Sequence, residues 1–146
     1  MTSTVLVPMD ERSSSVTALE FALSEYPDAD ITVIYSIGVV DSADGLGRLR
    51  GETRNRYLEA ESTADRVLAD AESRASEADV ALETDVAFGP PPQVIPEYAS
   101  THGIDHIVMG DHGMAGSKQL VNGTVPEMVV RRASVPVTVV RDPDER

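Results

Sequence analysis

The sequence predicts an α/β fold in which a parallel β-sheet lies between two layers of helices. Short apolar runs rich in β-branched residues alternate along the chain with longer segments whose apolar residues recur at helical spacing. Strands that alternate with helices pair in parallel, and the connecting helices lie on both faces of the sheet. The 146 residues suit a single domain, 1–146, and show no internal repeat.

The first half of the chain is expected to contain two strands and two helices. An apolar strand over residues 5–7 ends at Asp10, and serines at 13–15 are expected to cap the helix that follows. Pro27 ends this helix, because proline disrupts a helix interior. The other elements of this half are a β-branched strand over 31–37, a loop with four glycines over 38–51 and a long amphipathic helix over 53–78.

The second half of the chain continues the alternation. A strand over 80–88 stops at a glycine followed by three prolines, which is a sharp break. The remaining elements are a helix over 93–102, a strand over 104–109, a glycine-bearing loop over 110–123, a helix over 124–133, a strand over 135–140 and a polar tail over 141–146 that is expected to fray. Ligands of such sheets bind beyond the carboxyl ends of the strands, where the strand order reverses.

The composition excludes several classes of function. No apolar run is long enough to span a bilayer, we expect no signal peptide, and the lack of cysteine excludes disulfides and thiolate chemistry. The net charge of −13 argues against nucleic acid and anionic membranes as partners, because both require basic patches. We therefore expect a cytoplasmic protein.

The charged residues are also unusual in kind and in placement. Eleven of the twelve basic residues are arginine, and this acidic, lysine-poor surface favours a protein from a halophilic archaeon over an ordinary acidic one, because salt screens like charges. The segment 103–140 holds three acids and three bases, so the rest of the chain carries all thirteen excess negative charges. An anionic ligand would meet the least repulsion at this neutral segment.

The most informative stretch is the loop that contains Gly110 and Gly113 and ends at Gly123 and Thr124. Glycines let the backbone approach a ligand closely, and a helix N-terminus favours phosphate. The Thr124 hydroxyl could also donate to a phosphate oxygen. The alternative is structural, because Thr124 and Glu127 have the spacing of a capping box, in which the threonine only caps the helix.

This stretch resembles the universal stress protein family, whose mark is Gly-x2-Gly-x9-Gly-(Ser/Thr) between the fourth strand and the fourth helix. Gly110, Gly113, Gly123 and Thr124 match it at every spacing, and the similarity extends over roughly residues 4–141. The resemblance implies a five-stranded parallel sheet in the order 3-2-1-4-5, the Rossmann-like fold of the adenine nucleotide alpha hydrolase group. It also implies ATP binding, which is typical of members with the intact motif.

The resemblance further implies which residues hold the nucleotide. Those bordering adenine and ribose are Pro8, Met9, Asp10, Ser36, Ile37, Met109 and Gly110, and those holding phosphates are Gly113, Gly123, Thr124 and Val125. The implied ligand is ATP, ADP or AMP, with Mg²⁺ or Mn²⁺ as a possible companion. Asp10 could hold the metal through water or serve only as a turn residue. His112 could donate to phosphate, although a solvated loop histidine is an equal alternative.

Two departures from the family pattern bear on the predicted site. Ser36 and Ile37 stand where the family more often has a valine after a histidine, so the adenine pocket is expected to be slightly more polar. Pro126 removes a backbone N–H from the first turn of the fourth helix. The loss of one charge-assisted hydrogen bond to phosphate would cost about 1.5–3 kcal/mol.

A nucleotide-binding stress or signalling module is the leading hypothesis, with a slow ATP-hydrolysing or phosphoryl-transfer enzyme as the alternative. The sequence has no P-loop, no dinucleotide fingerprint and no nucleophile elbow, and no histidine pair has metal-ligand spacing. A flavodoxin-like carrier or a receiver domain is the third hypothesis. It is disfavoured because the first strand–helix loop lacks a phosphate-binding pattern and the third strand ends without an aspartate.

The last predicted strand, residues 135–140, indicates a homodimer. In the implied order it lies at a sheet edge, and it carries no acid but four valines, Val135, Val137, Val139 and Val140. An unpaired apolar edge is prone to association, and antiparallel pairing with a two-fold mate would satisfy its backbone. The resemblance implies the same arrangement. The alternative is a monomer in which the tail covers the edge.

Overall fold

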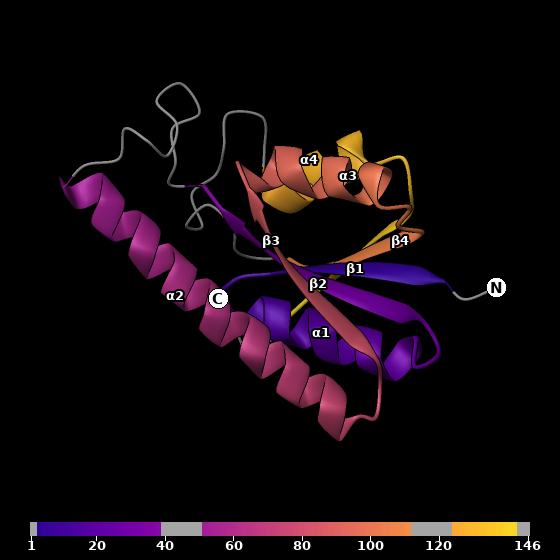
Figure 1. Ribbon diagram of the computed structural model, residues 1–146. Helices are drawn as coiled ribbons and strands as arrows, with labels where there is room; N and C mark the ends of the chain where they lie inside the picture. Colours follow the sequence, from indigo (N-terminus) through magenta and orange to yellow (C-terminus); the bar gives the residue numbers. More distant parts are fainter. Residues whose placement is uncertain (1–2, 39–50, 112–123, 143–146) are drawn as a thin grey trace.

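The computed structural model describes residues 3–38, 51–111 and 124–142, and over these ranges strands and helices alternate as predicted (Figure 1). The strands are Thr4–Met9 (β1), Asp30–Ile37 (β2), Leu82–Phe88 (β3), His106–Gly110 (β4) and Val137–Val140 (β5). The helices are Ser13–Glu25 (α1), Gly51–Glu77 (α2), Pro91–Thr101 (α3) and Val125–Arg132 (α4). None of these helices is both long and apolar enough to cross a membrane.

The five strands form one parallel sheet in the order β3-β2-β1-β4-β5, which confirms the predicted fold. The strand order reverses at β1, whose neighbours are β2 on one side and β4 on the other. Pairing of β1 with β2 continues to Met9, opposite Tyr35, but pairing with β4 ends at Leu6, opposite Ile107. Pro8 has no N–H with which to extend a ladder. The β1–β4 ladder therefore ends short of the carboxyl edge, where ligands of such sheets bind.

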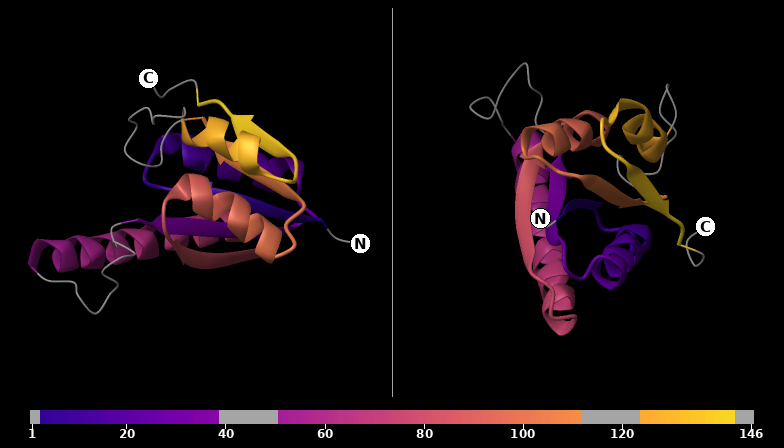
Figure 2. Two further views of the ribbon diagram at one scale, coloured as in Figure 1. Left: turned by 90° about the horizontal axis from the view of Figure 1, so that it is seen from above. Right: turned by 90° about the vertical axis from the view of Figure 1, so that its right-hand side faces the viewer.

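Two apolar cores, one on each face, hold the helices against the sheet. Figure 2 shows α1 and α2 on one side of the sheet and α3 and α4 on the other. Val7 and Val33 point into the α1–α2 core, together with Leu19 and Ala71 of the helices. Residues one position along the same strands, such as Ile34, point into the α3–α4 core. This alternation explains why the central strands are apolar on both faces.

The helix ends differ from the sequence-based predictions at α1 and agree with them at α4. No serine side chain caps α1: its N-cap residue is Arg12, which makes no side-chain cap bond. The hydroxyl of Ser15 instead lies 3.0 and 2.9 Å from the carbonyl oxygens of Asp10 and Arg12, to which it can donate. At α4 the capping box of Thr124 and Glu127 is present as predicted.

Other predicted boundaries shift by a few residues. The helix expected over 93–102 begins at Pro91, because proline is compatible with the first turn of a helix. The third strand begins at Leu82 rather than at 80, after a turn in which Asp79 has a φ of 58°. The last strand begins at Val137, so Val135 precedes it and packs beside the α3–α4 core.

Candidate functional site

The structure brings several of the predicted site residues to the carboxyl edge of the sheet. Met9 pairs with Tyr35, so the next residues, Asp10 and Ser36, continue from neighbouring strands. Gly110 ends β4, and Thr124 lies at the N-terminus of α4. His112, Gly113 and Gly123 lie outside the described residues.

The side chains of these residues fall into two groups by burial. Four of the predicted site residues are at most 2% exposed, namely Met9, Ile37, Met109 and Val125. Their side chains belong to the cores, so they can offer a ligand mainly backbone atoms. Asp10, Ser36 and Thr124 are half-buried, so they are not part of the cores.

Asp10 organises the turn between β1 and α1. Its Oδ1 accepts the Arg12 N–H at 2.9 Å, and its own N–H donates to Ser15 Oγ at 3.2 Å. These bonds agree with the turn interpretation of Asp10. Among the described residues no cluster of three acids or histidines could hold a metal ion. A Mg²⁺ at Asp10 would therefore draw most of its ligands from phosphate and water, a common arrangement for this ion.

Gly110 has a packing role that needs no ligand. A Cβ atom on Gly110 would lie 2.6 Å from the carbonyl oxygen of Ser14, closer than real Cβ contacts. The absence of a side chain therefore lets α1 approach the end of β4. This explains Gly110 within the protein itself, whereas the sequence motif suggested only close approach to a nucleotide.

The N-terminus of α4 is closed by its own side chains. Thr124 Oγ1 donates to Glu127 Oε1 at 3.0 Å and accepts the Glu127 N–H at 3.4 Å. The Thr124 N–H also points to Glu127 Oε1, at 3.5 Å. Both the hydroxyl and the N–H that the motif would offer to phosphate thus have an internal acceptor.

Asp142, the second residue of the tail that was expected to fray, packs against the site, whereas residues 143–146 lie outside the described residues. Asp142 is only 6% exposed, and its carboxylate accepts the Ser13 hydroxyl at 2.6 Å. Its N–H points to Asp111 Oδ1 at 3.4 Å, and the Asp111 N–H donates to the Val140 carbonyl at 3.0 Å. Sequence reasoning missed this link because no periodic pattern distinguishes Asp142 within the polar tail.

A groove of about 600 Å³ runs between α4 and β5 beside this edge. Its lining combines the polar Thr124, Glu127 and Asp111 with the apolar Val130 and Val139. The groove therefore connects the N-terminus of α4 with the edge strand of the sheet.

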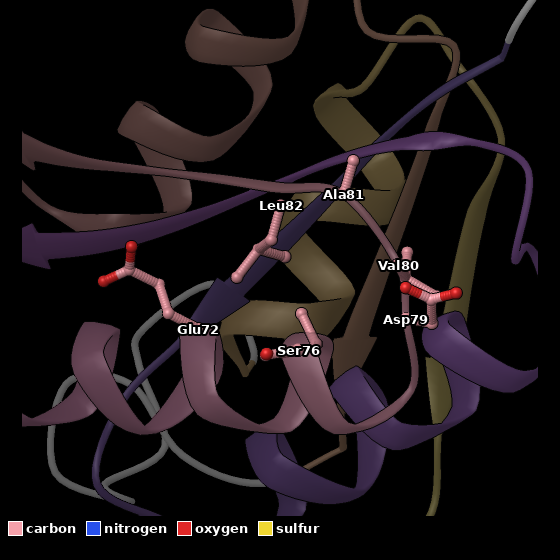
Figure 3. Close-up of a pocket in the computed structure, with 7 residues that line it drawn as sticks. Glu72, Ser76, Asp79, Val80, Ala81 and Leu82 are labelled. Carbon is pink, nitrogen blue, oxygen red and sulfur yellow. The ribbon is translucent and has the colours of Figure 1, made fainter.

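A second pocket, of about 540 Å³, lies near the amino end of β3 (Figure 3). Glu72 and Ser76 project from α2, and Asp79 and Leu82 come from the segment that leads into β3. Its two carboxylates would repel an anionic ligand. The amino end of a parallel sheet is also not where such folds bind ligands. We therefore place the candidate site at the carboxyl edge.

These features define an open, doubly wound α/β protein in which the carboxyl ends of β1, β2 and β4 and the N-terminus of α4 form the candidate site. The model of the universal stress protein family matches residues 1–141. The chain belongs to the universal stress protein family.

Relatives and solved structures agree with this assignment. Universal stress protein MJ0531 of Methanocaldococcus jannaschii is 30% identical, over 95% of this chain and 82% of its own length. Universal stress protein YxiE of Bacillus subtilis is 28% identical, over 97% of this chain and all of its own length. The structure of protein MJ0577 of M. jannaschii superposes with a TM-score of 0.77 at 19% identity, covering 99% of both chains.

Two further solved family members contain nucleotides. An Arabidopsis thaliana protein with AMP bound has a TM-score of 0.70 at 17% identity, covering 97% of this chain and 93% of its own. An Archaeoglobus fulgidus protein in complex with dAMP has a TM-score of 0.64 at 22% identity, covering 95% of this chain and 97% of its own. At these identities the similarity establishes the common fold.

Proposed function

We propose that this protein binds adenine nucleotides, ATP among them, as a single-domain cytoplasmic stress or signalling module. The observation that carries the proposal is the position of the glycine motif. Its first glycine, Gly110, ends β4 beside the strand-order reversal, and its threonine, Thr124, is the N-cap of α4. This is where doubly wound sheets hold nucleotides and where a helix N-terminus favours phosphate. The AMP and dAMP complexes of two family members support the choice of adenine.

The proposed contacts follow the carboxyl edge of the sheet. The backbone of Pro8 and Met9, with Asp10, borders the ribose, and Ser36 and Ile37 border the adenine. Glycines 113 and 123, with Thr124, hold phosphate, and His112 is a further donor in the same loop. Asp10 holds Mg²⁺ through water when a metal accompanies the nucleotide.

The test begins with the purified protein. Denaturation should release an adenine nucleotide identifiable by mass spectrometry, and calorimetric titration of the stripped protein should give binding of AMP and ATP but not of GTP. Gly113→Val should abolish nucleotide binding without loss of the circular dichroism spectrum, because the valine side chain obstructs backbone approach to phosphate. Unchanged affinity in the folded variant would contradict the site. ATP turnover above background would instead favour the enzyme hypothesis.

We also propose that the protein is a homodimer adapted to high salt. β5 is an edge strand, and Val139 on it and Val130 on α4 are 38% and 53% exposed. Exposed apolar groups next to an unpaired edge favour association with a second copy. The charge of −13 with one lysine supports adaptation to salt.

A further inference from the structure

The sheet has a second edge strand, β3, at the end opposite β5. Successive N–H groups along a strand point to opposite sides of it, so an edge strand directs half of them away from the sheet. The Gly89 N–H donates to the Ile37 carbonyl of β2 at 3.0 Å, in register with the pairing of the two strands. The odd-numbered residues of β3 therefore direct their N–H groups to β2. The even-numbered residues, Val86 among them, direct theirs to the free edge.

A carboxylate holds the outward N–H of Val86. Asp85 Oδ1 accepts this N–H at 2.8 Å, and Asp85 Oδ2 accepts the Tyr98 hydroxyl of α3 at 2.9 Å. The Tyr98 ring in turn stacks on His102, with 3.8 Å between the ring centroids. Burial and the bond to Asp85 raise the pKa of Tyr98 to about 12, so its hydroxyl keeps the proton that it donates. The Asp85 carboxylate is thus anchored to a neighbouring helix while it bonds the edge of the sheet.

The carboxyl half of β3 is otherwise suited to pairing with another strand. Residues 86–88 carry no charge, and Phe88 is 55% exposed. An apolar edge with free N–H groups is prone to strand addition. The net charge of −13 keeps copies of the chain apart at low ionic strength, but dissolved salt screens this repulsion. A carboxylate that is bonded to the edge does not depend on long-range repulsion.

We infer that Asp85, positioned by Tyr98, closes the β3 edge against strand addition by a second copy of this chain. An added strand would need the Val86 N–H as a donor, and Asp85 already accepts from it. Pairing would also bury the carboxylate in the new interface, at the cost of its hydration. The inference concerns the sheet edge opposite the proposed dimer interface, and it does not depend on nucleotide binding.

The test measures mass by light scattering in about 2 M KCl, where surface charges are screened. The parent protein carries Val139→Asp, which places a charge on β5 and so removes association through that edge from the comparison. Asp85→Ala is compared with Asp85→Asn, whose amide oxygen can still accept the Val86 N–H. Glu83→Ala is the matched control, because Glu83 is an exposed carboxylate two residues earlier, on the same face of the strand.

We expect Asp85→Ala to have about twice the mass of its parent, because antiparallel pairing of two β3 edges closes as a two-fold dimer. Asp85→Asn and Glu83→Ala should keep the parental mass. Tyr98→Phe, which removes the anchor and leaves the carboxylate, should associate more than the parent and less than Asp85→Ala. Hydrogen exchange measured by NMR locates the contact. The Val86 amide should be protected in the parent, lose protection in dilute Asp85→Ala and regain it as the concentration rises.

Two results would overturn the inference. If Asp85→Ala keeps the parental mass, the opened edge does not attract a second copy. If Asp85→Asn associates as strongly as Asp85→Ala, the charge and not the bond keeps copies apart. Should Asp85→Ala fail to give a folded spectrum, Tyr98→Phe decides in its place. Parental mass for that variant, with the Val86 amide protected as in the parent, would then count against the inference.

Discussion

The backbone of Gly110 lies directly against the carbonyl of Ser14, the second residue of α1. A Cβ atom at Gly110 would come within 2.6 Å of that carbonyl oxygen and 2.7 Å of Ser14 Oγ. We predict that Gly110→Ala lowers the free energy of unfolding by about 1–3 kcal/mol, because the helix backbone must shift to admit the methyl group. Urea denaturation of the nucleotide-free protein measures this loss.

Gly38→Ala is the control for this measurement. A Cβ atom at Gly38 would meet the Gly89 carbonyl oxygen at 3.6 Å, an ordinary contact. Its effect on stability should stay within about 1 kcal/mol. A Gly110→Ala protein as stable as the wild type would show that the glycine serves only the ligand.

The elements of the fold and the position of the glycine motif could be predicted from the sequence. The alternation of apolar runs predicted every strand and helix, because burial on two faces of a parallel sheet leaves a strong pattern. The sequence motif placed Gly110 and Thr124 at the carboxyl edge, and the structure agrees. The bonds of Glu127 to Thr124 follow from a local capping pattern and were therefore predictable.

Contacts between segments distant in the sequence were not predictable. The contact of Gly110 with Ser14 and the bond from Ser13 to Asp142 join residues about 100 or more positions apart, and they depend on how closely α1 packs on the sheet. Nothing periodic distinguishes Asp142 from the other acids of the tail. The error at the start of α3 has a different cause. Proline can end a regular element or occupy the first turn of a helix, so the sequence alone did not show that Pro91 begins α3.

His106 supplies a prediction for pH dependence. Its Nε2 lies 2.7 Å from Thr138 Oγ1, and its ring forms a T-shaped pair with Tyr26 at a centroid distance of 5.3 Å. Burial lowers the pKa of His106 below 6.5. The unfolded chain, with the higher pKa, binds the proton first as pH falls. The stabilising contribution of the neutral ring is therefore complete above pH 6.5 and is lost as pH falls from there to the folded pKa.

We expect His106→Gln to remove this part of the pH dependence. As pH falls from about 7.5 to 5, the free energy of unfolding should decrease more for the wild type than for the variant. His102→Gln, at an exposed histidine of the α3 C-cap, serves as the control. NMR titration of the folded wild type measures the pKa itself. A His106 resonance with a midpoint at or above 6.5 would contradict the prediction.

The net charge of −13 predicts stability that depends on salt. Repulsion among the excess carboxylates opposes folding, and dissolved ions screen it. The midpoint of thermal unfolding should therefore rise between about 0.1 M and 2 M KCl. Sucrose at matched osmolality is the control, because exclusion of a solute from the surface also strengthens apolar burial. A midpoint that does not change with KCl would remove the support for salt adaptation.

The exposed valine of β5 supplies the last prediction, which concerns the homodimer. β5 lies at the edge of the sheet, and Val139 and Val130 form an apolar surface with the groove between them. An aspartate at Val139 would place a charge in the interface that we propose, where it would be desolvated and would face its two-fold copy. We therefore expect Val139→Asp to raise the dimer dissociation constant by about a hundredfold or more. Light scattering in about 2 M KCl, where surface charges are screened, measures this change.

Leu58→Asp is the matched control, because Leu58 is 49% exposed and lies on α2, away from β5. Its dimer should dissociate no more readily than that of the wild type. The wild type should have twice the mass of one chain, which is 15.6 kDa. A wild-type mass of one chain at micromolar concentration would show that β5 is not a dimer interface under these conditions. A dimer that is insensitive to Val139→Asp would place the contact on another surface.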